Sequence, residues 1–176
     1  MAASKKTKTT RRAARAARPA TTASPMAADA ISLLEADHRE VDGYFDQFED
    51  ADGATAKKSL ATQICLALKV HAQIEEELFY PAAREKTGDG DLIDEAIVEH
   101  AGAKILIAQI EAMQPGQDLY DAKVKVLGEQ VRHHVREEEE ELFPEVRESG
   151  VDLDALGARM AARKAELMAL LSPAQS

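Results

Sequence analysis

Apolar residues recur at steps of three and four along four long segments of the chain, which places them on one face of a helix in each segment. The segments run over about 29–49, 55–85, 91–113 and 118–148, and none of them alternates with the period of two that marks a strand. The apolar faces contain Ile31, Leu34, Val41, Phe45 and Phe48, then Ile64, Leu68 and Leu78, then Ile93, Ile97, Ile107 and Ile110, and finally Leu127, Val131 and Leu142. We therefore predict four helices and no strand.

Short polar or glycine-containing breaks separate these segments, at Asp50–Gly53, Gly88–Gly90 and Pro115–Gly116. Short links between long helices predict an all-α fold, an antiparallel up-down four-helix bundle. Pro81 lies near the end of the second segment and is expected to kink it there. A fifth amphipathic segment follows Gly150, which predicts an extra C-terminal helix packed outside the bundle; its apolar residues are Leu153, Leu156, Met160, Leu167 and Leu170.

Two stretches of the chain match each other at a distance of 63 residues. Each begins with His-x-x-x-Glu, at His71 and Glu75 in one stretch and at His134 and Glu138 in the other. Each then continues with further acids, an aromatic residue and a proline at similar offsets. The match indicates that the second and fourth segments are copies of one helical unit.

A further histidine interrupts the apolar face of each of the other two segments. His38 lies 33 residues before His71, and His100 lies 34 residues before His134. The chain is therefore a tandem repeat of a two-helix unit, and each unit contributes two histidines and a glutamate. Residues at i and i+4 share a helix face with Cβ atoms about 5–6 Å apart, so each His-x-x-x-Glu pair can face one point. Because the middles of the helices in an up-down bundle lie at one level, all six residues are expected to converge.

Four imidazoles and two carboxylates inside an apolar core indicate a metal site. Isolated buried carboxylates are too costly to keep ionised, and one cation, or better two, removes that cost. Two terminal histidines for each ion and two bridging glutamates suit a pair of iron or manganese ions, whereas zinc prefers a closed tetrahedral set. His133 points about 100° away from its neighbour His134, so we predict that it is exposed or lies just outside the ligand set.

These residues carry a resemblance to the hemerythrin-like family, whose domains are called HHE cation-binding domains. The resemblance covers about residues 30–146 and rests on Asp37-His38, His71-x-x-x-Glu75-Glu76, Glu99-His100 and His134-x-x-x-Glu138-Glu139. It implies a four-helix bundle around a non-haem di-iron centre, two iron ions with an oxo or hydroxo bridge, manganese being the less favoured metal. It also implies which residues hold the metals: terminal ligands at His38, His71, His100 and His134, and bridges at Glu75 and Glu138.

The chain departs from the oxygen-carrying hemerythrins at two positions. Those proteins have a further histidine one turn after the third-helix ligand, where this chain has Lys104, and an aspartate bridge where it has Glu138. With one fewer histidine, more coordination positions stay open, which favours chemistry with oxygen, peroxide or nitric oxide and a role in oxidative stress. Two alternatives remain: a protein that reversibly binds or senses oxygen or iron without turnover, and a DNA-associated iron protein. Whether the chain is an enzyme, with peroxide-consuming or other redox activity, stays open on the sequence.

Charge is divided unevenly along the chain. Residues 1–28 carry seven lysines and arginines and no acid, whereas the rest carries 15 basic and 32 acidic residues, a net charge of −17 within a total of −10. We predict a disordered basic tail over residues 1–28, the bundle over 29–148, and the C-terminal helix and its tail over 149–176. The basic tail could contact nucleic acid weakly, through phosphate charge alone.

Cysteine content and hydropathy give an expected location. Cys65 is the single cysteine, so no internal disulfide can form, and a reducing cytoplasm is the expected compartment. No run of about 18 apolar residues occurs, so no membrane partner is expected. The oligomeric state is left open by the sequence.

Overall fold

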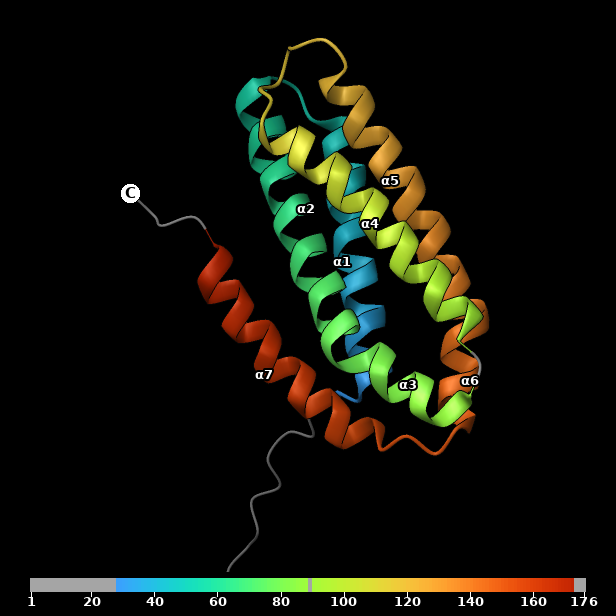
Figure 1. The fold of residues 1–176 in the computed structure, drawn as a ribbon. Coiled ribbons are helices and arrows are strands. Elements are labelled where there is room, and N and C mark those ends of the chain that lie inside the picture. Colours follow the sequence, from blue (N-terminus) through green and yellow to red (C-terminus); the bar gives the residue numbers. More distant parts are fainter. Residues whose placement is uncertain (1–27, 89, 173–176) are drawn as a thin grey trace, which may run out of the picture.

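The computed structural model describes residues 28–88 and 90–172, and within them every regular element is helical. Two short helices, α3 (Tyr80–Thr87) and α6 (Phe143–Glu148), lie at one end of the molecule (Figure 1). The four long helices alternate in direction and form the bundle: α1 (Ala30–Asp50), α2 (Ala54–Ile74), α4 (Asp91–Glu111) and α5 (Tyr120–Glu137). The predicted all-α, antiparallel four-helix bundle is confirmed.

Local sequence signals set the helix ends. The side chain of Asp29 accepts hydrogen bonds from the backbone N–H and the hydroxyl of Ser32, which satisfies a free donor at the start of α1. α3 ends at Gly88, whose φ of 73° lies in the left-handed region that glycine adopts without strain. α5 begins at Tyr120, two residues later than the sequence predicts, because the φ of Leu119 is 68° and a right-handed helix cannot include it.

A widened, π-helical turn follows the histidine of α2 and the histidine of α5. These turns are η1 (Glu75–Phe79), which joins α2 to α3, and η2 (Glu138–Leu142), which joins α5 to α6. After η1 the backbone N–H of Tyr80 donates to the carbonyl oxygen of Glu75, five residues earlier, and η2 repeats this pattern. The distortion expected at Pro81 therefore begins six residues earlier than predicted, and it widens the helix at the glutamate that follows each histidine.

The apolar core consists of two clusters with a polar layer between them. One cluster lies toward α3 and α6 and includes Phe79 and Phe143, whereas the other lies toward the opposite end and includes Phe45. Along α1, Leu34 belongs to the first cluster and Val41 to the second, so a residue midway between them lies in the polar layer. The polar layer therefore crosses the bundle near the middle of its long helices.

The C-terminal helix α7 (Leu153–Leu171) packs across α1 and α2 on the outside of the bundle, as predicted (Figure 1). Its buried residues Leu156, Met160 and Leu167 join the first of the two core clusters. A Cβ on Gly157 would lie 2.5 Å from the carbonyl oxygen of Ala28, so only glycine allows α7 to approach the start of α1 this closely. One face of the bundle is thus covered by a fifth helix.

The prediction that Ile97 and Leu170 lie on buried apolar faces is wrong. Ile97 is 41% exposed because it lies at the edge of the buried face of α4, and Leu170 is 74% exposed because it lies in the last turn of α7, beyond the buried Leu167. In the part of the chain that the structure describes, no helix combines the length and apolar character needed to cross a membrane. The predicted basic tail lies, except for Ala28, outside the described residues.

Candidate metal centre

The polar layer of the bundle consists of the six residues that the sequence pattern singles out. Each of the four long helices contributes one histidine, and each π turn contributes its first glutamate. All six are buried, with exposed fractions from 0% for Glu75 to 8% for His71, whereas His133 is exposed as predicted. The structure brings together His38, His71, Glu75, His100, His134 and Glu138.

The imidazoles form two pairs, one in each repeat. His38 Nε2 and His71 Nε2 are 3.2 Å apart, and His100 Nε2 and His134 Nε2 are 3.1 Å apart. The Nε2 atoms therefore point at each other in the interior of the bundle.

Each glutamate lies between the two histidine pairs. Glu75 Oε2 is 3.0 Å from His71 Nε2 in its own repeat and 3.4 Å from His100 Nε2 in the other. Glu138 Oε2 repeats this arrangement at 3.5 Å and 3.4 Å from the two remaining histidines. Because each carboxylate reaches one histidine of each pair, both are placed to bridge them.

Several buried atoms of the cluster lack a hydrogen-bond partner among the described residues. They include both carboxylate oxygens of Glu75 and Oε2 of Glu138. A carboxylate removed from water and given no donor is strongly destabilising, and cations relieve that cost. The donor atoms fall into two overlapping sets, and each set lies within 4.8 Å and could hold a metal ion. The first set is His38, His71, Glu75 and Glu138, and the second is Glu75, His100 and His134.

An acidic residue lies at the outer nitrogen of every imidazole. His71 Nδ1 is 3.7 Å from Asp37 Oδ2, which is beyond hydrogen-bond distance. The other three Nδ1 atoms donate to carboxylates over 2.8–2.9 Å, in the pairs His38 with Glu139, His100 with Glu76 and His134 with Glu99. Because a carboxylate only accepts, Nδ1 carries the proton in these three and Nε2 presents its lone pair to the cluster. Metal-binding histidines are oriented by acids in this way.

No role was predicted from the sequence for these four acids, although each repeat has one acid directly before its first histidine and another directly after its buried glutamate. Asp37 and Glu99 each directly precede a cluster histidine, but each approaches the histidine of a different helix. Lys104, which lies one turn after His100, binds both oxygens of Glu76 through its Nζ at 2.6 Å and 2.7 Å. Lys104 thus holds the acid that orients His100 instead of facing the cluster.

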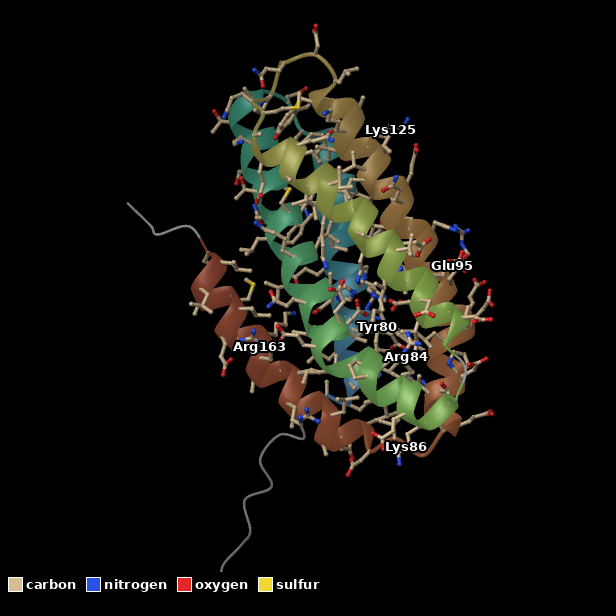
Figure 2. The ribbon with its side chains drawn as sticks, in the orientation of Figure 1. Tyr80, Arg84, Lys86, Glu95, Lys125 and Arg163 are labelled. Atoms are coloured by element: carbon tan, nitrogen blue, oxygen red, sulfur yellow. The ribbon has the colours of Figure 1, made fainter. Side chains whose placement is uncertain are left out.

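The aromatic residue after each π turn differs between the repeats. The Tyr80 hydroxyl donates to Glu138 Oε1 at 2.8 Å, and its ring lies 5.7 Å from the His100 ring; Figure 2 shows Tyr80 where α2 gives way to α3. The equivalent Phe143 stacks on His38 at 5.8 Å and carries no hydroxyl. Burial and the nearby carboxylates raise the pKa of Tyr80 well above its usual value, so the phenol keeps its proton. Glu138 therefore has one oxygen held by a donor, whereas Glu75 has none.

The carboxylates shift the pKa values of the residues around them. Burial lowers the pKa of His71, but the carboxylates of Glu75 and Asp37 outweigh it and raise that pKa to about 10. Burial dominates at His100, whose pKa is lowered. Burial would raise the pKa of Glu138, but the neighbouring histidines lower it to about 2. Glu138 therefore stays ionised at neutral pH, and its negative charge favours a cation nearby.

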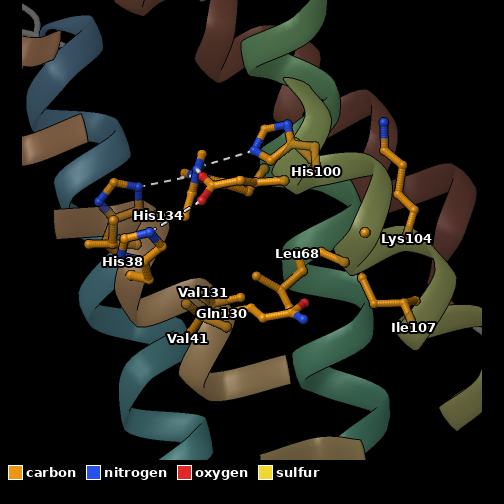
Figure 3. Close-up of a pocket in the computed structure, with 16 residues that line it drawn as sticks. His38, Val41, Leu68, His100, Lys104, Ile107, Gln130, Val131 and His134 are labelled. Carbon is orange, nitrogen blue, oxygen red and sulfur yellow. Dashed lines mark hydrogen bonds and ion pairs between the residues drawn. The ribbon is translucent and has the colours of Figure 1, made fainter. Parts of the chain in front are cut away.

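A cavity of about 240 Å³ adjoins the cluster (Figure 3). The cluster histidines line one part of it, and the apolar side chains of Val41, Leu68 and Val131 line another. Exposed residues of α4 and α5, including Gly102 and His133, line its outer part. The cavity therefore connects the histidine cluster with the face of the bundle formed by α4 and α5.

The chain is similar to known proteins in both its sequence and its fold. A crystal structure of a hemerythrin HHE cation-binding domain-containing protein from Mycobacterium kansasii has the same fold, with a TM-score of 0.70 and 23% identity, covering 81% of this chain and 89% of that chain. A protein from Nostoc sp. (strain PCC 7120) named DNA nickase is 32% identical over 115 residues, which is 65% of this chain and 32% of that protein. This chain thus spans about a third of the length of that relative. The profile of the hemerythrin HHE cation-binding domain matches residues 29–146, and the chain therefore belongs to the hemerythrin HHE cation-binding domain family.

Proposed function

We propose that the six converging residues hold a pair of iron ions and that the chain uses them to handle oxygen, peroxide or nitric oxide. The observation that carries the proposal is the pair of buried glutamates at the centre of the cluster. Their oxygens face four imidazole nitrogens, and three of the four oxygens have no donor among the described residues. Charged groups in that setting need cations, because burial without compensation would destabilise the fold.

The arrangement of donor atoms favours binding of two ions over binding of one. His38 and His71 would hold one ion, the pair His100 and His134 would hold the other, and both glutamates would be shared. Mixed nitrogen and oxygen donors with bridging carboxylates suit iron first and manganese second. A single zinc ion would need only four of the six groups and would leave buried donors without a partner.

A non-haem di-iron centre supplies electrons and open coordination positions for oxygen, peroxide or nitric oxide. The protein contributes orientation, because the acids at Nδ1 fix the tautomer of His38, His100 and His134. It also contributes a partly apolar cavity that is large enough for small ligands and opens toward α4 and α5. The Tyr80 hydroxyl holds a proton toward Glu138 Oε1, which leaves the other oxygen of that carboxylate directed at the histidines.

Two histidines and two shared glutamates supply four protein bonds to each ion, so positions for exogenous ligands remain in an octahedral arrangement. The test is to load the full chain with ferrous iron, oxidise it in air, and titrate it with azide and then with hydrogen peroxide. We expect azide to change the near-ultraviolet absorption and peroxide to be consumed faster than by the same concentration of free iron. A loaded protein that does neither refutes the open positions and favours iron sensing. Reversible oxygen binding over many cycles without oxidation favours a carrier.

Association with DNA is a second candidate function. The observations that favour it are the relative named DNA nickase and the seven basic residues within residues 1–28. The proposal is limited to localisation through phosphate charge, which weakens steeply with salt. We expect the full chain to bind duplex DNA at low salt, and a variant lacking residues 1–27 to lose this binding while keeping azide binding. Equal DNA binding by both forms refutes the role of the basic segment.

A further inference from the structure

A second, smaller group of side chains that could hold a metal ion lies outside the buried cluster, on the face formed by α4 and α5. His133 Nε2 is 3.3 Å from Glu137 Oε1 and 3.7 Å from Glu99 Oε1. The side chains of His133, Glu99 and Glu137 are 56%, 25% and 30% exposed, so solvent ions reach them. We call these three residues the outer group. One imidazole and two carboxylates are donors that Fe²⁺ and Mn²⁺ accept, and three ligands leave positions for water.

The outer group is joined directly to the buried cluster. Glu99 Oε1 faces His133, while Glu99 Oε2 accepts the hydrogen bond from His134 Nδ1 at 2.8 Å. Glu99 and His133 also line the cavity that reaches all four cluster histidines. A cation held by the outer group therefore lies one carboxylate away from a proposed ligand and beside an existing opening to the others.

The other repeat has no such group, although the two repeats are otherwise equivalent at the cluster. The residues equivalent to His133 and Glu137, 63 positions earlier, are Val70 and Ile74, which are 1% and 0% exposed. They belong to the same core cluster as the buried residues of α7. Asp37, the equivalent of Glu99, forms an ion pair with Lys164 of α7. The C-terminal helix thus packs against the side of the cluster near Asp37 and leaves only a smaller cavity of about 100 Å³ there, whereas the outer group lies on the side that α7 does not cover.

From this asymmetry we infer that the outer group is a loading site, which captures a divalent cation and delivers it to the buried cluster. The inference rests on the proposed metal pair. The three donors of the outer group leave a captured ion partly hydrated, so the ion exchanges readily. A site that passes its ion on needs this fast exchange, whereas a permanent site does not. The route uses the cavity that opens toward α4 and α5, because this cavity has about 240 Å³ and reaches all four cluster histidines. The smaller cavity past Asp37 has about 100 Å³, is lined in part by Lys164 of α7, and reaches only His71 among the four.

The test is the rate of iron uptake by metal-free full-length protein under anaerobic conditions, with limiting Fe²⁺ and quenching at set times by a chromogenic ferrous chelator. The double variant His133→Ala/Glu137→Gln keeps all six cluster residues and Glu99. We expect its initial rate to fall about tenfold, the lower end of the range by which a charged cleft raises on-rates. Its final iron content should stay at two ions per chain. Glu129→Gln removes the same charge from an exposed position on α5 and should keep the wild-type rate.

A second measurement observes the outer group itself. In protein already loaded with iron, a Mn²⁺ titration followed by electron paramagnetic resonance should reveal one additional weak site. That site should persist in Glu129→Gln and be absent from the double variant. A normal uptake rate in the double variant overturns the loading site. A lowered final iron content also overturns it, because the outer group would then act on the stability of the cluster. A wild type that takes up no metal pair refutes the proposed function itself, and this outcome is distinct from the other two.

Discussion

Two buried tyrosines allow the hydrogen bond to Glu138 to be measured against an internal reference. Tyr80 is 2% exposed and its hydroxyl donates to Glu138 Oε1 at 2.8 Å. Tyr120 is 1% exposed, and its hydroxyl has no hydrogen-bond partner among the described residues. The substitutions Tyr80→Phe and Tyr120→Phe therefore remove the same atom from equally buried rings, and only the first breaks an interaction.

The expected difference follows from the charge on the acceptor. A hydrogen bond to a charged group contributes about 1.5–3 kcal/mol, and Glu138 carries a charge because its pKa is lowered to about 2. Tyr80→Phe should lower the free energy of unfolding by that amount, or the melting temperature by roughly 3–12 °C for a chain of this length. Tyr120→Phe should be neutral within about 0.5 kcal/mol or stabilising, because it removes a buried hydroxyl that has no partner.

Urea unfolding of the metal-free proteins, followed by circular dichroism, gives both free energies on one scale. Measuring the metal-free form separates the hydrogen bond from any change in metal affinity. Equal destabilisation by the two substitutions would mean that the loss comes from packing of the hydroxyl and that Glu138 gains nothing from Tyr80. In that case the hydrogen bond that Glu138 accepts from Tyr80, and that Glu75 lacks, would contribute nothing to stability.

Further predictions concern the cluster and α7. His134→Ala should lose metal, whereas His133→Ala should keep its full metal content at equilibrium. Equal metal loss from both variants in elemental analysis would mean that His134 is not the metal-binding histidine of this pair. Chelation of the loaded protein should lower its melting temperature, because ligands bound only by the native state stabilise it. The pKa of His71 is raised from 6.5 to about 10, so its contribution to the stability of the metal-free protein is present below pH 6.5 and is lost as pH rises through about 10. Urea titrations across that range should show this decline in metal-free protein and not in loaded protein, where a metal-bound imidazole is already deprotonated. Gly157→Ala should destabilise the fold by about 1–3 kcal/mol in the same assay, because its Cβ would lie 2.5 Å from a backbone oxygen, and Gly43→Ala, with open space around it, serves as the control.

Helical periodicity was sufficient to predict the bundle and the convergence of the six cluster residues. His71 and Glu75 share a helix face because they are four residues apart, and the repeat places His134 and Glu138 in the same relation. His38 could be placed because it interrupts an apolar face near the middle of a long helix. Whether these six residues bind metal stays a prediction that the experiments above address.

The remaining features depend on contacts between helices, which spacing along the chain does not encode. Glu99 precedes His100, yet its carboxylate binds His134 on the next helix, and no local pattern identifies that partner. The π turns shift the expected distortion from Pro81 back to Glu75, because the backbone widens where the glutamate turns inward. Gly157 and the apolar face of α7 determine which side of the bundle α7 covers. The sequence contains both features but does not reveal that they pack against the start of α1.

The departures from repeat symmetry all make the two halves of the cluster inequivalent. Tyr80 donates to Glu138, but no residue donates to Glu75 from the equivalent position, because Phe143 stands there. α7 packs against the side of the cluster near His71, where Lys164 pairs with Asp37, and the larger cavity opens on the side formed by α4 and α5. A small ligand that enters through this cavity therefore approaches from α4 and α5. The repeat explains why six cluster residues converge, and its asymmetry explains how the two halves of the cluster differ in their access to solvent.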